Sequence, residues 1–231
     1  MDYKRNQKYF SGKSYIKLVI ASSVIALILL AMKVYGIGII LLVAAVAIGW
    51  FTRRPKDSEI DAAFQEERDK LRAAALKKLG IDEEEISIAD PIITYAYTNT
   101  EKIYDDSLSK CQVIKGKDGR YRTPRIEMNF FCFSENEIHF YYRYASLVSD
   151  TVKEGTKIIN YKDVVSVSSD TETVPVKDPK TGLEVPGKKF VTDYFSVNVP
   201  SDSIKCLVAN SSTADSAVNA LRALIKQKKN A

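Results

Sequence analysis

The sequence predicts an N-terminal transmembrane α-helical hairpin followed by a soluble α+β domain, an antiparallel β barrel or sandwich of about seven strands capped by a C-terminal helix. Two observations predict this fold class. Two long apolar runs lie near the N-terminus, and from residue 86 onward apolar residues alternate with polar ones, as in half-buried strands. The chain has 231 residues, which suits a membrane anchor and one domain of ordinary size.

The basic residues of the chain are concentrated beside the apolar runs. Residues 1–56 hold nine basic residues and one acidic residue, a net charge of +8, whereas residues 57–231 hold 25 basic and 28 acidic residues, a net charge of −3. A near-neutral domain has no excess charge to neutralise phosphates, so the sequence predicts no nucleic-acid partner. The charge distribution is instead typical of membrane topology.

The apolar stretch Leu18–Phe51 is too long for one membrane span. As a single helix its 34 residues would measure about 51 Å, against about 30 Å for the hydrocarbon core of a bilayer. We expect Lys33, Gly36 and Gly38 to break it into two arms, because they combine a charge with two flexible positions. The sequence therefore predicts a hairpin over residues 17–51.

Flanking charges predict the orientation of this hairpin. Lys17 closes a basic N-terminal segment, and Arg53 and Arg54 follow the second arm, with Trp50 at an interface position. Under the positive-inside rule both ends of the chain are cytoplasmic and the turn is outside. A hairpin that enters only one leaflet predicts the same ends. A signal peptide cleaved after residues 45–47 is a further alternative, but the apolar stretch is about twice the usual length of a signal sequence.

Periodicity predicts the remaining elements. A helix is expected over residues 58–79, capped by Ser58 and packed on its own domain, on the membrane or as a stalk. Residues 126–144 show the two-residue alternation of an antiparallel hairpin. The last helix is expected over residues 212–228 with a buried face of Val218, Leu221 and Ile225. Further strands are expected at Ile92–Thr98, Gln112–Ile114, Thr156–Tyr161, Val164–Ser168, Thr173–Val176, Phe190–Val199 and Ile204–Ala209.

These elements divide the chain into four parts. They are a basic cytoplasmic N-terminus (1–16), the transmembrane hairpin (17–51), a juxtamembrane basic segment and helix (52–80) and the β domain with its helix (81–231).

The order of elements resembles that of bacterial membrane-anchored proteins with a pleckstrin-homology-like (PH-like or GRAM-like) domain. Three stretches carry the resemblance: the hairpin Ile126–Tyr144, the run Ile159–Val167, and Phe195–Val199 with Ile204–Ala209 and the last helix. Such domains are mostly binding or scaffolding modules. The resemblance implies a PH-like fold and a multi-pass protein of the bacterial cytoplasmic membrane with both termini in the cytoplasm.

The sequence holds no pattern typical of catalysis. It has one histidine, His139, three widely spaced cysteines, and no glycine-rich phosphate loop or nucleophile elbow. We therefore expect a non-enzymatic protein with no cofactor and no metal site. An enzyme remains an alternative if the fold gathers His139, Asp163 and tyrosines into one concave cluster.

The most suggestive surface feature is a basic run at a Gly-rich turn, residues 115–125. Its five basic residues would meet anionic headgroups, or they would form an ordinary solvated hairpin tip. They are Lys115, Lys117, Arg120, Arg122 and Arg125.

The sequence thus predicts a membrane-tethered binding or scaffolding protein. Its expected partners are membrane lipid through the hairpin, a protein partner, and anionic headgroups through the basic run. The alternative is a subunit of a membrane transport, secretion or envelope complex in which the hairpin contacts partner helices.

Overall fold

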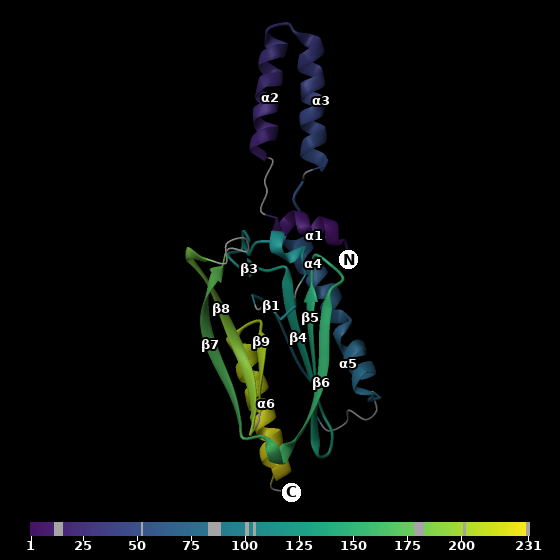
Figure 1. Ribbon diagram of the computed structural model, residues 1–231, viewed down its shortest axis with the longest axis vertical. Helices are drawn as coiled ribbons and strands as arrows, with labels where there is room; N and C mark the ends of the chain where they lie inside the picture. Colours follow the sequence, from purple (N-terminus) through teal and green to yellow (C-terminus); the bar gives the residue numbers. More distant parts are fainter. Residues whose placement is uncertain are drawn as a thin grey trace.

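Three antiparallel sheets and several short helices make up the computed structural model (Figure 1). A four-stranded sheet has the order β1-β4-β5-β6, a three-stranded sheet has the order β7-β8-β9, and β2 pairs with β3. The structure describes residues 1–11, 16–51, 53–82, 89–99, 102–103, 105–177, 183–200 and 202–229. The strands are β1 (Ile92–Thr98), β2 (Ile114–Lys115), β3 (Tyr121–Arg122), β4 (Arg125–Phe133), β5 (Glu137–Ser146), β6 (Val152–Asn160), β7 (Ser166–Lys177), β8 (Glu184–Val199) and β9 (Asp202–Val208).

The helical hairpin consists of α2 (Ile16–Ala31) and α3 (Tyr35–Phe51), with 16 and 17 residues. At 1.5 Å per residue they measure about 24 and 26 Å, less than the about 30 Å of a hydrocarbon core. Among the described residues, no helix is both long and apolar enough to cross a membrane. The predicted transmembrane hairpin is therefore wrong, and so is the predicted multi-pass location in a bacterial cytoplasmic membrane.

The predicted single barrel or sandwich of about seven strands is also wrong. The strands divide into three separate sheets, and the predicted strands at 164–168 and 173–176 are one continuous strand, β7. Its ladder with β8 runs from the pair Ser166–Asn198 to the pair Lys177–Glu184, with a register shift after Pro175. Polar residues occupy the middle of β7, so the apolar alternation that signals a strand is missing there.

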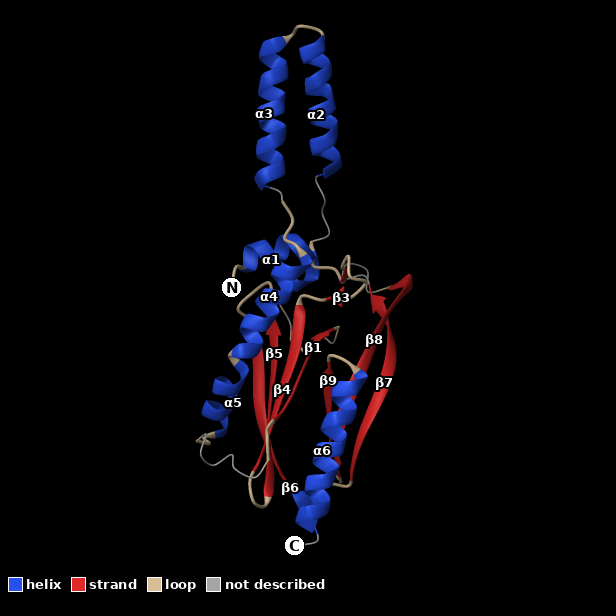
Figure 2. Cartoon of the chain, turned by 180° about the vertical axis from the view of Figure 1, so that it is seen from behind, coloured by secondary structure: helices blue, strands red, loops and turns tan. Residues whose placement is uncertain are grey.

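The first core lies between the two larger sheets and helix α6 (Ser211–Lys229). Phe131 of β4 meets Phe195 of β8 edge to face at 5.4 Å between ring centroids. Val218, Leu221 and Ile225 of α6 are buried in this core, as the helical periodicity predicts. Figure 2 shows α6 along the three-stranded sheet.

The second core covers the opposite face of the four-stranded sheet. Helices α1 (Tyr3–Phe10), α4 (Asp57–Asp69) and α5 (Leu71–Leu79) pack there, so the helix predicted over 58–79 is two helices that pack on the chain's own sheet. Tyr9 and Phe10 of the basic N-terminus are fully buried against this sheet. The sequence did not predict this apolar contact.

Candidate functional site

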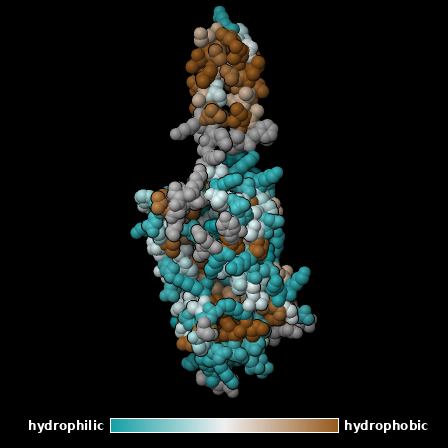
Figure 3. Space-filling view, in the orientation of Figure 1, coloured by the Kyte–Doolittle hydropathy of each residue, from teal (hydrophilic) through white to brown (hydrophobic). Residues whose placement is uncertain are grey.

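The helical hairpin exposes a large apolar surface. Of the twenty large apolar side chains that are exposed among the described residues, fifteen lie between Leu18 and Trp50. The space-filling view shows this surface as a brown projection beyond the mostly hydrophilic remainder (Figure 3). Monomeric proteins rarely leave such a contiguous patch in contact with water, so this surface marks an interaction site.

The two arms of the hairpin pack through small residues. Ala26 and Ala45 are buried between them, and Gly49 faces Val19. A Cβ atom on Gly38 would lie 2.8 Å from Cγ of Leu30, so glycine permits the close approach. Small residues at such contacts bring helix backbones together.

The turn of the hairpin differs from the predicted break. It uses Lys33, which adopts a left-handed conformation with φ of 63°, whereas Gly36 and Gly38 both lie within α3. Gly36 has open space around it, so neither glycine forms the turn. The break thus lies at Lys33, one of the three residues expected to form it, and not at Gly36 or Gly38.

The residues expected to flank a membrane lie at the base of the hairpin. Trp50 is 77% exposed, and Arg53 is exposed. The Arg54 guanidinium lies over the ring of Tyr9, 4.7 Å from its centroid, and thereby links the base of the hairpin to α1. The side chain of Lys17 lies outside the described part of the structure.

Directly below the hairpin, Arg122 forms the centre of an ionic cluster. Its side chain is 2% exposed and bonds two carboxylates, Asp61 of α4 and Asp118 of the β2–β3 turn. Nε and Nη2 donate to Asp61 at 2.8 and 2.6 Å, and Nη1 and Nη2 donate to Asp118 at 2.9 and 2.8 Å. Such bidentate pairs are the strongest and most directional ion pairs in proteins.

Asp57 extends this cluster to the N-terminal helix. It accepts hydrogen bonds of 2.8 Å from the Tyr9 hydroxyl and from the backbone N–H of Lys117. Tyr97 of β1 likewise donates to Asp61 at 2.8 Å. We call these six residues the Arg122 junction: Tyr9, Asp57, Asp61, Tyr97, Asp118 and Arg122. It fastens α1, α4, β1 and the β2–β3 turn together at the base of the hairpin.

The surroundings of the Arg122 junction lower the pKa of Asp118 and raise the pKa values of Tyr9 and Tyr97. Hydrogen bonds from Arg122 hold the pKa of Asp118 well below its ordinary value. Burial, reinforced by the bond to Asp57, raises the pKa of Tyr9, and burial with the charge of Asp61 raises that of Tyr97. The two tyrosines therefore remain protonated donors, and Asp118 remains an ionised acceptor.

The structure separates the five basic residues predicted to meet anionic headgroups. Arg122 is buried by its carboxylate partners, and Arg125 is partly buried. Lys115 is exposed and lies over the ring of Tyr121 at 5.5 Å from its centroid, while Lys117 and Arg120 are exposed. The run therefore does not form one five-residue surface, although Lys115, Lys117 and Arg120 still face outward.

A groove of 640 Å³ opens beside the Arg122 junction. Tyr95 and Tyr97 of β1 line one wall, and residues 189–193 of β8 line the other. Strand β9 pairs with β8 only from Asp193 onward, so β8 has a free edge along this wall within the described residues. The groove thus combines aromatic surface with unpaired strand edge, a combination suited to contact with another chain.

The chemical candidates named from the sequence are not brought together. His139 Nε2 lies 3.9 Å from Oε2 of Glu137 on the same strand, β5, and Asp163 lies in a separate turn, η3 (Tyr161–Asp163). Burial raises the pKa of Cys111 and of Cys132 to about 11, so both thiols are poor nucleophiles at neutral pH. Among the described residues, no group of three or more histidine, cysteine or acidic side chains is placed to hold a metal ion.

The partners of Arg122 were missed by the sequence analysis. Asp57 is in the first turn of α4, where an acidic residue suits the helix dipole, and Asp61 follows one turn later, so the sequence gives neither residue a distinctive signal. Comparison with known proteins adds no further assignment: no family model, no curated protein and no solved structure matches this chain.

Proposed function

We propose that the protein is a non-enzymatic binding protein that associates with lipid through its helical hairpin, without crossing a bilayer, and holds its β-sheets beside the lipid surface. The exposed apolar surface of α2 and α3 carries this proposal.

The distribution of apolar side chains on α2 favours lipid over a protein groove. Val24, Ile25, Leu27 and Ile28 are between 49% and 59% exposed, whereas Ala26 is buried against α3. Successive residues of a helix point about 100° apart, so these four side chains span an arc of about 160° on the side of the helix opposite Ala26. A protein groove covers one face of an amphipathic helix, but acyl chains cover every face.

The second arm shows the same distribution. Ile39, Ile40, Val43 and Val46 of α3 are between 53% and 68% exposed. No charged residue occurs in the sequence between Lys33 and Arg53, so α3 offers no polar face to water. Burial of this surface in an acyl layer is favourable by about 25 cal/mol per Å².

Vesicle flotation of the full chain tests the proposal. The double variant Ile40→Glu/Val43→Glu places two carboxylates on the exposed face of α3, where they would have to leave water for the acyl layer. We expect wild type to float with phosphatidylcholine vesicles and the variant to lose most of this association, because each charge costs about 2–3 kcal/mol in an apolar layer.

Ile158→Glu/Val165→Glu is the matched control, since both residues are exposed apolar residues outside the hairpin, at 61% and 69%. It is expected to float like wild type. Equal flotation of all three proteins, or flotation of none, would reject lipid association through the hairpin.

A further inference from the structure

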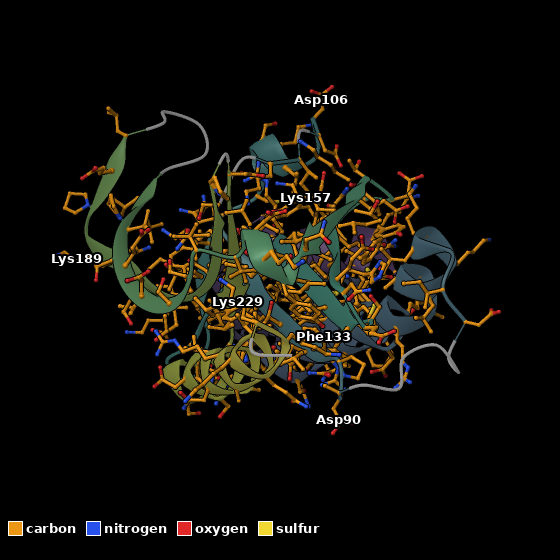
Figure 4. All side chains as sticks on the ribbon, turned by 90° about the horizontal axis from the view of Figure 1, so that it is seen from below. Asp90, Asp106, Phe133, Lys157, Lys189 and Lys229 are labelled. Carbon is orange, nitrogen blue, oxygen red and sulfur yellow. The ribbon has the colours of Figure 1, made fainter. Side chains whose placement is uncertain are left out.

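A second cavity, of 230 Å³, lies between the four-stranded sheet and strand β9. Four lysines and two tyrosines of its lining come from distant parts of the chain: Lys102, Lys153, Lys157, Lys205, Tyr142 and Tyr144. Figure 4 views the molecule from below and labels Lys157 on the side away from helix α6. We call this the lysine–tyrosine cavity.

Strands β5 and β6 form one side of the lysine–tyrosine cavity. Lys153 and Lys157 are four residues apart on β6, so both side chains leave the same face of the sheet. Gly155 lies between them, and a Cβ atom there would be 2.5 Å from the Tyr142 hydroxyl. The missing side chain therefore lets Tyr142 of the neighbouring strand lie between the two lysines.

A buried carboxylate, that of Glu127, lies behind the cavity and positions Lys102 at it. Lys102 donates to the Tyr144 hydroxyl at 2.6 Å, and its Nζ lies 3.7 Å from Glu127. Glu127 is 1% exposed and also accepts the backbone N–H of Leu207 at 2.9 Å. It thus fixes β9 against β4 and fixes Lys102 at the cavity, although it does not line the cavity itself.

The charges around the cavity are unbalanced. No acidic residue is among the described residues that line it. Lys102 pairs with Glu127, Lys157 with Asp202 and Lys205 with Glu172, but none of these carboxylates is among the described residues that line the cavity. Asp202 and Glu172 are also about half exposed, and such pairs contribute little. No described carboxylate pairs with Lys153. The described residues thus supply three carboxylates beside four ammonium groups, and an anion within the cavity would reduce the repulsion between the lysines.

We propose that the lysine–tyrosine cavity binds a phosphomonoester group. Each lysine offers three N–H donors to a compact anion, and the hydroxyls of Tyr142, Tyr144 and Ser203 add neutral donors from the same lining. At about 30 Å³ per water molecule, the volume admits a phosphate group with a small substituent. It is below the about 300 Å³ at which sites for larger organic ligands begin.

Titration calorimetry of the full chain in non-ionic detergent tests this site, first with inorganic phosphate and then with glycerol phosphate. Lys153→Gln is the informative variant, because it leaves no carboxylate of the described residues without a partner. We expect wild type to bind both compounds and Lys153→Gln to bind them about tenfold more weakly, with an unchanged unfolding midpoint.

Lys162→Gln, which removes an exposed lysine outside the cavity, is the matched control and is expected to bind like wild type. Vesicles with and without phosphatidic acid distinguish the source of the group. If Lys153→Gln weakens only the response to phosphatidic acid, the phosphomonoester is a lipid headgroup; if it weakens binding of glycerol phosphate, the ligand is free in solution. If wild type binds none of inorganic phosphate, glycerol phosphate (each at about 10 mM) and phosphatidic acid vesicles, or if Lys153→Gln binds all three like wild type, the proposal is overturned.

Discussion

Two basic sites of this protein differ in how carboxylates balance their positive charge. In the Arg122 junction one guanidinium meets two carboxylates and is removed from water. In the lysine–tyrosine cavity four ammonium groups surround a space whose described lining has no carboxylate. The first arrangement is complete within the chain and acts as a fastener, whereas the second leaves Lys153 without a described carboxylate partner and is suited to an external anion. Local charge balance, and not the number of basic residues, separates a structural site from a binding site.

The largest expected effect is the loss of Arg122. Arg122→Ala removes four hydrogen bonds and leaves Asp61 and Asp118 without their cation. Because both carboxylates are about 40% exposed, water compensates in part, and we expect the free energy of unfolding to fall by about 2–3 kcal/mol. Urea denaturation of the full chain in detergent measures it.

Arg120→Ala is the control for this prediction, since Arg120 belongs to the same turn but its side chain is exposed. It should change the free energy of unfolding by less than about 0.5 kcal/mol. Equal effects of the two substitutions would show that Arg122 is not a structural fastener, and the contrast between the two basic sites would then fail.

Local periodicity predicted the elements that depend on neighbouring residues. The alternation over residues 126–144 corresponds to β4 and β5, and the spacing of Val218, Leu221 and Ile225 corresponds to the buried face of α6. Both patterns depend on which face of one element is buried, which a short window of sequence records. The prediction of membrane-spanning helices failed because α2 and α3 are too short. The turn at Lys33 divides the apolar stretch into helices of only 16 and 17 residues.

The two basic sites could not be predicted because their partners are distant in the sequence. Asp61 and Arg122 are 61 positions apart, and the lysines of the cavity span positions 102 to 205. The basic run 115–125 is conspicuous in the sequence, yet Arg122 in its midst is buried. Lys153 has no conspicuous neighbours, yet it faces the cavity. Proximity in the sequence indicates shared function only when the fold leaves those side chains on one surface.

The Arg122 junction and the lysine–tyrosine cavity each contain a glycine, and a glycine-to-alanine substitution at each tests the difference between the two sites. A Cβ atom on Gly116 would lie 2.6 Å from Asp118 and 2.8 Å from Asp57, within the Arg122 junction. Because these carboxylates are fixed by their hydrogen bonds, we expect Gly116→Ala to lower the free energy of unfolding by about 1–2 kcal/mol and to leave phosphate affinity unchanged.

Gly155→Ala is expected to do the reverse. The atoms it would meet belong to the outer end of the Tyr142 ring, which can shift at little cost but only by moving its hydroxyl within the cavity. Phosphate affinity should therefore fall several-fold while the unfolding midpoint changes little. If Gly155→Ala destabilises the protein and leaves phosphate binding intact, Tyr142 serves packing rather than ligand contact.

The smallest expected effect is a change in how stability depends on pH. Hydrogen bonds from Arg122 lower the pKa of Asp118 in the folded protein, whereas in the unfolded chain it is close to the ordinary value of about 3.9. The folded state therefore binds fewer protons, and the contribution of Asp118 is complete above about pH 4 and is lost as the pH falls through the lowered pKa. Asp118→Asn lacks this pH-dependent contribution to stability, so the difference in unfolding free energy between the variant and wild type should shrink on acidification in a series of urea denaturations.

Asp150→Asn, at an exposed carboxylate that pairs with no described basic side chain, should retain the pH profile of wild type. A wild-type profile for Asp118→Asn would mean that the Arg122–Asp118 pair is too well hydrated to act as a fastener, and that Asp61 alone balances Arg122.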